Sequence, residues 1–295
     1  MARASRLPDR FLVRDERFSL ADVDPADTAG LDKQGAEASL AHGVERLGEL
    51  QERLYAQDRW ALLLVLQGMD AAGKDGVVKH VLSGINPAGC QVFSFKAPSP
   101  EELDHDFLWR AARALPERGR IGIFNRSYYE EVVTVRVHPE FLEKQRLPPR
   151  CVTKAIWDER MQDIAAFERY LARNGVLVRK FFLHVSRKEQ ARRFLERIDH
   201  PEKNWKFRRE DVLERAHWRE YQRHWSTAIA QTSRAHAPWT VVPADHKWFA
   251  RLLVAEAAVA ALEELELDFP RLGGARRAEL ARARRLLEAE RRRRR

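Results

Sequence analysis

Cysteine and long hydrophobic runs are scarce in this sequence of 295 residues, and their scarcity excludes two classes of protein. The chain has two cysteines, Cys90 and Cys151, too few for the disulfide framework of a small secreted domain. The longest apolar run, Trp60 to Leu66, has the length of a buried strand and is too short to cross a membrane. Residues 1–20 mix Arg with Asp and contain no signal-peptide stretch. We therefore expect a protein of the reducing cytoplasm with no membrane partner.

Basic residues outnumber acidic residues strongly in two short segments, and these segments account for the net charge of +9. Residues 275–295 contain ten Arg and three Glu, a net charge of +7. Residues 187–209 contain nine Lys or Arg and four acids, a net charge of +5, so the rest of the chain sums to −3. A local basic cluster indicates a polyanion partner more strongly than a uniformly basic composition does. No metal-ligand spacing is found among five of the ten histidines, His80, His105, His138, His184 and His200.

Strand-like and helix-like segments alternate along the middle of the chain. Apolar runs predict strands, and apolar positions three or four residues apart predict helices. We expect strands over residues 60–66, 92–95, 121–124, 176–185 and 240–242, and helices over residues 36–58, 101–114, 152–173, 188–198, 211–233 and 248–265. Because strands alternate with helices, and the first strand is apolar on both faces, we predict an α/β fold with a doubly wound parallel sheet flanked by helices.

The chain divides into three parts by its periodicity and charge. Residues 1–35 lack steady periodicity and are expected to form an irregular N-terminal extension. Residues 36–268 are expected to form the α/β domain, including a helical lid at about residues 187–210. Residues 272–295 are expected to form a basic C-terminal helix or tail. For this tail we favour a solvated segment over a specific role, although clustered Arg adds affinity for any dense chain of negative charge.

The segment from Gly68 to Gly76 reads G-M-D-A-A-G-K-D-G and joins a predicted strand to a predicted helix. This is the setting that a phosphate-binding loop, or P-loop, requires. Glycines let the backbone wrap around phosphate oxygens, N–H groups at the helix start form an anion hole, and Lys74 adds a point charge. A chance glycine-rich turn is the alternative. The predicted phosphate ligands in this loop are Gly68, Ala71, Ala72, Gly73, Lys74, Asp75 and Gly76.

Two aspartates distinguish this loop from the common form. Asp75 stands where a P-loop usually has Ser or Thr after the Lys, and Asp70 lies within the loop. Both add negative charge beside a phosphate, which is repulsive unless a cation is bound. We therefore expect Mg²⁺, with Mn²⁺ as the alternative ion, held by Asp70 and Asp75. A turn-stabilising role for Asp70 and a helix-capping role for Asp75 stay open as alternatives.

A second motif follows the strand predicted at residues 121–124 and reads N-R-S-Y-Y-E-E. The carboxyl end of a strand in such a sheet faces the ligand crevice. Arg126 at this place can clamp a transferring phosphoryl group with two hydrogen bonds, and a surface ion pair is the alternative. For Tyr128 and Tyr129, core packing and a ligand contact are equally good interpretations. The residues of this motif assigned to nucleotide binding are Asn125, Tyr129, Glu130 and Glu131.

The basic segment at residues 187–209 is expected to close over the substrate as a lid. Arg193 and Arg197 are four residues apart on the predicted helix and share a face, so we expect both to bind phosphate. Trp205 lies between two lysines, and we favour packing of its ring against the lid over stacking on a base. Closure of such a lid would exclude water from a phosphoryl transfer. The lysines that complete the predicted phosphate ligands are Lys203 and Lys206.

Three motifs together resemble the polyphosphate kinase 2 family, namely G-x-D-x-x-G-K-D, I-F-N-R-S-Y-Y-E and R-F-L-E-R-I-D-H-P-x-K-x-W-K. The resemblance runs from about Glu37 to Leu265. It implies a P-loop kinase-like fold similar to thymidylate kinases, and Mg²⁺-dependent transfer of phosphate between polyphosphate and nucleotides. The form of the second motif resembles the third subclass, whose members phosphorylate both AMP and ADP. The family also favours a homo-oligomer, either a dimer or a tetramer.

The resemblance implies a polyphosphate-dependent kinase that transfers the terminal phosphoryl group of inorganic polyphosphate to ADP and AMP, forming ATP and ADP. One alternative is an ATP-dependent nucleoside or nucleotide kinase on the same fold, which the P-loop alone does not exclude. Another is a non-catalytic polyanion-binding protein that uses the Arg tail. We expect no specific nucleic-acid partner. The residues that the resemblance and the motifs together make catalytic are Asp70, Lys74, Arg126, Arg193 and Arg197.

Overall fold

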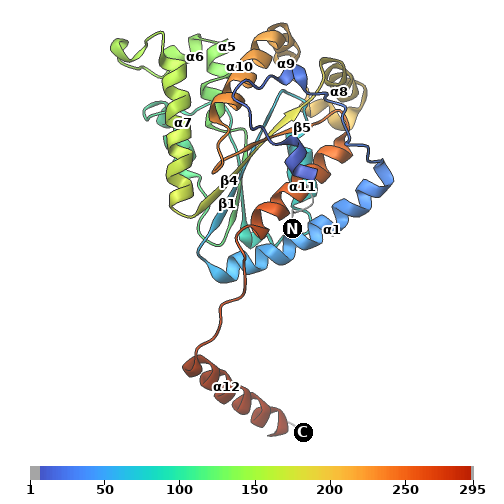
Figure 1. Cartoon of the computed structure of the whole chain (residues 1–295), viewed down its shortest axis with the longest axis vertical. Coiled ribbons are helices and arrows are strands. Elements are labelled where there is room, and N and C mark those ends of the chain that lie inside the picture. Colours follow the sequence, from blue (N-terminus) through green and yellow to red (C-terminus); the bar gives the residue numbers. More distant parts are fainter. Residues whose placement is uncertain (1–6, 294–295) are drawn as a thin grey trace.

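A parallel β-sheet forms the centre of the fold (Figure 1). The computed structural model describes residues 7–293. In this part of the chain the strands are β1 (Ala61–Gly68), β2 (Cys90–Ser94), β3 (Ile121–Asn125), β4 (Val176–His184) and β5 (Trp239–Pro243). They lie in the order β2-β3-β1-β4-β5, and each neighbouring pair is parallel. The predicted α/β fold with a doubly wound parallel sheet is confirmed.

Helices cover both faces of the sheet (Figure 1). On one face, α1 (Lys33–Gln57) and α2 (Lys74–Val81) pack against α11 (Lys247–Glu263). On the other face, α7 (Ile156–Arg173) packs against β4 and α10 (Trp218–Thr232). The other α-helices of the domain are α3 (Pro100–Leu103), α4 (Trp109–Arg113), α5 (Thr134–Val137), α6 (Glu140–Glu143), α8 (Arg187–Asp199) and α9 (Arg209–Leu213). Short 3₁₀ turns within the domain are Pro87–Gly89, Tyr128–Glu131, Pro149–Cys151, Pro201–Lys206 and Glu214–His217.

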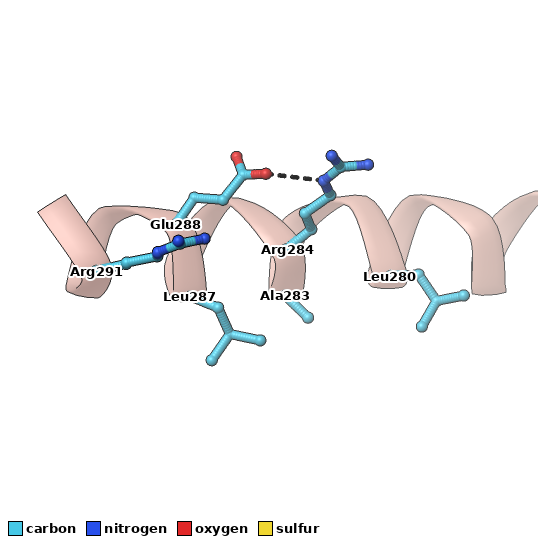
Figure 2. A pocket seen from close by; sticks show the side chains of 6 residues that line it. All are labelled: Leu280, Ala283, Arg284, Leu287, Glu288 and Arg291. Atoms are coloured by element: carbon cyan, nitrogen blue, oxygen red, sulfur yellow. Dashed lines mark hydrogen bonds and ion pairs between the residues drawn. The ribbon is translucent and has the colours of Figure 1, made fainter.

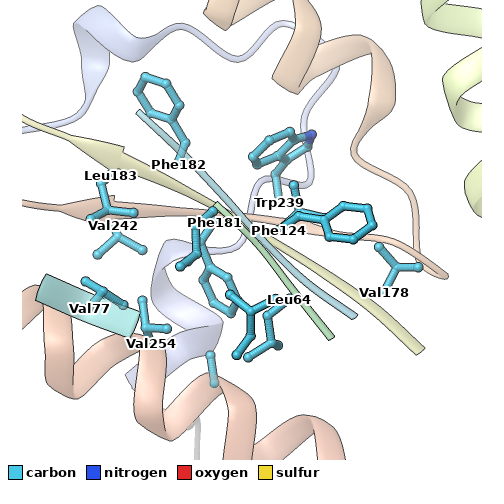
Figure 3. Packing of buried hydrophobic residues seen from close by; sticks show 14 of the residues in the cluster. Leu64, Val77, Phe124, Val178, Phe181, Phe182, Leu183, Trp239, Val242 and Val254 are labelled. Atoms are coloured by element: carbon cyan, nitrogen blue, oxygen red, sulfur yellow. The ribbon is translucent and has the colours of Figure 1, made fainter. Parts of the chain in front are cut away.

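Burial on both faces explains why the central strands are largely apolar. The side chains of β4 alternate between the two helical layers, as Figure 3 shows. Phe181 points toward Val254 of α11, whereas Phe182 points to the opposite layer, where its ring lies 4.9 Å from that of Trp225 in α10. In β1, every residue from Ala61 to Gln67 is buried, and the last residue, Gly68, is half-buried. This continuous core holds the carboxyl ends of the strands in fixed positions.

Two helices predicted as continuous are each broken by a turn. Residues 101–114 form α3 and α4, and the side chain of Asp106 accepts a backbone hydrogen bond in the turn between them. Residues 211–233 form the end of α9, a 3₁₀ turn and α10. In that turn, Glu214 pairs with His138 at 2.9 Å. These polar side chains stabilise the turns, although the apolar positions of the sequence have helical spacing.

The N-terminal segment packs on the edge of the sheet at β5. It contains 3₁₀ turns at Leu7–Phe11 and Leu20–Asp22 and is otherwise irregular as far as the start of α1. The backbone N–H of Val13 donates to the carbonyl of Trp239 at 2.9 Å, and Phe11 and Leu20 are buried. The irregular segment therefore contributes apolar side chains to the core.

The last helix, α12 (Gly274–Arg293), stands apart from the domain at the end of an extended linker (Figure 1). All its described residues are exposed. Figure 2 shows Leu280, Ala283 and Leu287 on one side of the helix, with Arg284 and Glu288 on another. Across residues 7–293, no helix is both long enough and apolar enough to span a membrane.

Candidate active site

The P-loop and the second motif meet at the carboxyl edge of the sheet. β1 and β3 are neighbours, and Leu66 is paired with Asn125, so both segments leave the sheet side by side. Gly68, the last residue of β1, has a φ of +149°, and a Cβ at this position would lie 2.7 Å from the carbonyl oxygen of Leu183. No side chain fits there. The chain can therefore make this turn only with glycine.

The loop delivers its backbone to the start of α2. Gly73 caps α2 with a φ of +108° and no side-chain hydrogen bond, which leaves the N–H groups of the first turn available to an anion. Ala71 also adopts a left-handed conformation, with a φ of +59°. This geometry fits the anion hole predicted for a P-loop, with Gly76 in the first turn of the helix.

Lys74 folds back onto its own loop. Its Nζ donates to the carbonyl oxygens of Gly68 at 2.6 Å and Met69 at 3.2 Å. Burial, assisted by the nearby Arg126 guanidinium, lowers the pKa of Lys74 to about 8 against the opposing effect of three carboxylates, Asp70, Glu130 and Asp75. A phosphate that enters the loop would replace the two carbonyls as acceptors and favour the charged amine.

Arg126 crosses over the loop from the second motif. It has a φ of +66°, a conformation that costs a non-glycine residue of order 1–3 kcal/mol. Its Nη2 lies 2.6 Å from Oδ1 of Asp70, and its Nη1 lies 3.9 Å from Glu130. These two carboxylates, Glu130 most strongly, raise the pKa of Arg126. The strained backbone thus directs a permanent positive charge at the mouth of the loop.

Two further carboxylates, Asp75 and Glu130, lie beside the ion pair of Arg126 and Asp70. Asp75 accepts a hydrogen bond of 2.7 Å from the side-chain amide of Asn125. Glu130 accepts bonds from Gln67 at 3.1 Å and from Thr134 at 2.5 Å. Carboxylate and amide oxygens are ligands that hard divalent cations prefer, so the donor set fits such an ion. Within residues 7–293, however, no three His, Cys, Asp or Glu side chains are grouped as a metal site, so phosphate oxygens and water would have to complete the coordination.

Arg193 lies behind the loop, and this corrects the predicted phosphate contact. The side chain is 4% exposed, and its Nε bonds to Glu189 at 2.7 Å. Its Nη1 donates to the carbonyls of Ala71 and Ala72 at 2.9 and 2.8 Å, and its Nη2 donates to that of Ala244. Every guanidinium nitrogen is therefore engaged with protein. Arg193 braces the side of the loop that faces away from the anion hole.

Arg197 lies one turn after Arg193 on α8 and has a partner within the segment predicted as the lid. Its Nη1 is 3.5 Å from Asp211, a residue of α9 that the sequence analysis did not single out. Burial and the proximity of Asp70 raise the pKa of Asp211, whereas Arg197 and Arg126 oppose that shift. Arg197, Asp211, Arg126 and Asp70 thus form a series of alternating charges between α8 and the loop. Arg197 stays a candidate phosphate ligand.

Tyr129 and Glu131 face the interior, which corrects their assignment to nucleotide binding. Tyr129 is fully buried, and its hydroxyl donates to Glu168 at 2.9 Å. Tyr128 is also buried and donates to the same carboxylate, so the core-packing interpretation holds for both tyrosines. Glu131 lies 3.5 Å from Arg160, and both side chains are nearly buried. Of the predicted second-motif ligands, only Asn125 and Glu130 face the loop.

A buried ion pair beneath the tyrosines was missed. Lys180 of β4 lies 2.5 Å from Glu168 of α7, and both side chains are 0% exposed. Lys180 also donates to the hydroxyl of Tyr129 and to the carbonyl of Thr232, each at 2.8 Å. Burial lowers the pKa of Lys180 to about 8, and Glu168 opposes that shift. The signal in the sequence was a Lys, next to Arg179, in a strand that is otherwise apolar from Val176 to Leu183.

The segment after α8, which was predicted as part of the lid, is open to solvent. Trp205 is 78% exposed, so the expectation that its ring packs against the lid is wrong. Its indole N–H bonds to the carbonyl of Glu202 at 3.1 Å, and Lys206 lies 4.9 Å from its ring centre. Lys203 pairs with Glu196 of α8 at 2.6 Å. Each of the two lysines thus has a partner within the segment predicted as the lid.

A family model and curated relatives both match most of this chain. The family model described as Polyphosphate kinase 2 (PPK2) matches residues 30–270. The chain is 54% identical over 245 residues to an ADP-polyphosphate phosphotransferase of Rhodopseudomonas palustris, covering 83% of this chain and 85% of that protein. It is 43% identical to an AMP/ADP-polyphosphate phosphotransferase of Meiothermus ruber, covering 87% and 92% of the two chains.

The fold is also similar to that of a solved relative. The crystal structure of polyphosphate kinase 2 from Arthrobacter aurescens TC1 aligns with a TM-score of 0.86 and 40% sequence identity, covering 95% of this chain and 99% of that one. The family model spans the sheet, the P-loop, the second motif and α8 to α11. The chain therefore belongs to the polyphosphate kinase 2 family.

Proposed function

We propose that this protein transfers the terminal phosphoryl group of inorganic polyphosphate to ADP and to AMP, forming ATP and ADP. The observation that carries the proposal is the P-loop with Lys74 at its centre and Arg126 across its mouth. Membership of the family supplies the donor class. Two relatives, one named for ADP and the other for both AMP and ADP, support both acceptors.

The transfer needs positioning and charge neutralisation more than proton removal. The attacking oxygen belongs to the terminal phosphate of the nucleotide, whose second pKa is about 6, so it is largely ionised near neutral pH. This oxygen forms a bond to the terminal phosphorus of the polyphosphate. At the same time, the bond from that phosphorus to the bridging oxygen of the chain breaks, and the shortened polyphosphate leaves. Lys74 and the loop N–H groups hold the phosphates, and Arg126 leaves Asp70 to contact the transferring group.

A divalent cation fits the carboxylates of the loop, of which Asp70 is released when Arg126 leaves it. We propose Mg²⁺, held by Asp70 and Asp75, with Mn²⁺ able to use the same oxygen ligands. The ion would neutralise charge on the phosphate oxygens during transfer. The role of Arg193 in this scheme is to hold the carbonyl side of the loop so that its N–H groups stay aligned.

The pH dependence of polyphosphate use should report Lys74. Its pKa is lowered to about 8, so the free enzyme loses this positive charge as the pH rises through that value. We expect kcat/KM for polyphosphate, at saturating ADP, to fall above a pH of about 8, while kcat falls only at higher pH because bound phosphate restores the charge. A kcat/KM that stays level to pH 10 would contradict this assignment.

The test of the function is a donor assay without ATP. The purified protein is incubated with Mg²⁺, long-chain polyphosphate and either ADP or AMP, and the nucleotides are separated by chromatography. We expect ATP from ADP, and ADP followed by ATP from AMP, with no product when polyphosphate is omitted. If polyphosphate supports neither reaction but ATP phosphorylates a nucleoside or nucleotide, the protein is an ATP-dependent kinase and the proposal fails.

A further inference from the structure

The helix α12 carries a large positive charge that the domain does not neutralise. It begins at Gly274, after the end of the family match at residue 270. Residues 275–295 carry a net charge of +7. Within the described part of the helix, two arginines have an acidic partner, Arg276 with Glu279 at 2.6 Å and Arg284 with Glu288 at 2.8 Å. These pairs leave a strong positive field along the helix.

The arginines of α12 are arranged in rows. Arg277, Arg284 and Arg291 are seven residues apart, which places them on one face at intervals of about 10.5 Å. Arg285 and Arg292 form a second row beside the first. Since every described side chain of the helix is exposed, both rows are open to a ligand. Such rows fit an extended polyanion that carries a negative charge on each of its repeating units.

We propose that α12 is a second binding site for polyphosphate, which retains long chains on the enzyme while their ends react at the P-loop. The inference rests on the proposed function, because it takes polyphosphate to be the substrate. Guanidinium groups bind phosphate oxygens through paired hydrogen bonds and stay charged at any physiological pH. A chain held at α12 reaches the P-loop as an intramolecular partner, which raises its local concentration there.

The apolar side of α12 is too small for the main alternative, a helix that lies on a membrane. That side consists of Leu280, Ala283 and Leu287 (Figure 2). Leu286, which precedes Leu287 in the helix, is also exposed. An interfacial helix commonly places a broad apolar face with aromatic residues into the lipid, and residues 271–295 contain no aromatic residue. The absence of aromatics also disfavours single-stranded nucleic acid, whose bases stack on such side chains.

The distance between α12 and the P-loop predicts that only long polyphosphate chains benefit from the second site. α11 begins near the P-loop, since Arg193 contacts Ala244 just before it, and its 17 residues extend about 25 Å away from there. The linker at residues 264–273 can span up to about 33 Å. α12 lies at the opposite end of the molecule from α8 and α9 (Figure 1). Only a long polyphosphate can therefore touch α12 and the P-loop together.

The experiment compares long chains of several hundred phosphates with tripolyphosphate as donors to ADP. The test variant neutralises five arginines of α12, and a matched control keeps their charge by replacing the same five with Lys. We expect the neutral variant to raise KM for long chains about tenfold at low salt, with kcat unchanged and with KM for tripolyphosphate unchanged. The Lys control should stay near the wild type. The substitutions are Arg277→Gln, Arg282→Gln, Arg285→Gln, Arg291→Gln and Arg292→Gln.

Direct binding separates failure of this site from failure of the proposed function. Fluorescently labelled long-chain polyphosphate is titrated with the full-length wild type and with the neutral variant, and weaker binding by the variant is expected. If KM changes equally for long chains and tripolyphosphate, or for neither, α12 is not a polyphosphate site. The same holds if the variant loses binding to anionic lipid vesicles or to single-stranded DNA but not to polyphosphate. If the wild type forms no ATP from either donor, the proposed function fails, and the titration still decides whether α12 binds the chain.

Discussion

Replacing Lys74 with Ala is expected to lower kcat/KM for polyphosphate by roughly a thousandfold or more, because the reaction loses the cation at the centre of the P-loop. A single well-placed cation on a transferring phosphoryl group is worth roughly 10³–10⁵ in rate. In the structure, Lys74 contacts only backbone carbonyls of its own loop by hydrogen bonds, those of Gly68 and Met69. These bonds are local to the loop, so we expect the fold to survive the substitution.

The control for Lys74→Ala lies on the same helix. Lys79 is exposed in the last turn of α2, so Lys79→Ala removes the same charge from the same element without touching the loop. This control should keep wild-type kinetics, and both variants should melt close to the wild type. Retention of more than about a tenth of the wild-type kcat/KM by Lys74→Ala would contradict the assigned role of this residue.

The second large effect is expected in stability, from the buried pair of Lys180 and Glu168. Lys180→Met removes the cation but leaves Glu168 and the two tyrosine hydroxyls in a site that water does not reach. Breaking one partner of a buried pair costs about 3–5 kcal/mol. For a domain of this size we expect the melting temperature to fall by about 6–20 °C. Because Tyr128 and Tyr129 follow Arg126 closely, activity should fall as well.

A double variant decides whether the loss comes from an unpaired charge. In Lys180→Met with Glu168→Leu, both charges are gone, and replacement of a buried pair by apolar residues is often neutral. We expect the double variant to melt above Lys180→Met. Lys154→Met, at an exposed position before α7, serves as the control and should change the melting temperature little. If the double variant melts well below Lys180→Met, the network is held by hydrogen bonds rather than by charge pairing.

The sequence predicted those features of the fold and site that depend on local pattern. The apolar run before Gly68 and the glycines around Lys74 define a strand, a loop and a helix start within one short segment, and the structure has all three. Alternation of strands and helices predicted the α/β class. The order of the strands is not local, because it depends on which crossovers pack best, and the sequence analysis made no prediction of it.

The errors concern the direction in which a side chain points. Helical spacing places Arg193 and Arg197 on one face of α8, but it does not say that Arg193 faces the carbonyls of the loop. Tyr129 and Glu131 belong to a functional motif, yet their partners Glu168 and Arg160 are supplied by α7. Contacts between segments far apart in the chain leave no periodic signal.

The central claim is that polyphosphate is the phosphoryl donor and that the P-loop performs the transfer. The most direct measurement uses polyphosphate that carries radioactive phosphorus, with unlabelled ADP and Mg²⁺, and locates the label in the ATP formed by the wild type and by Lys74→Ala. The account predicts label in the terminal phosphate of ATP, about one labelled group for each ATP, and almost none from the variant. Unlabelled ATP would mean that two ADP molecules had exchanged a phosphoryl group, and that result, or the absence of ATP, would contradict the account.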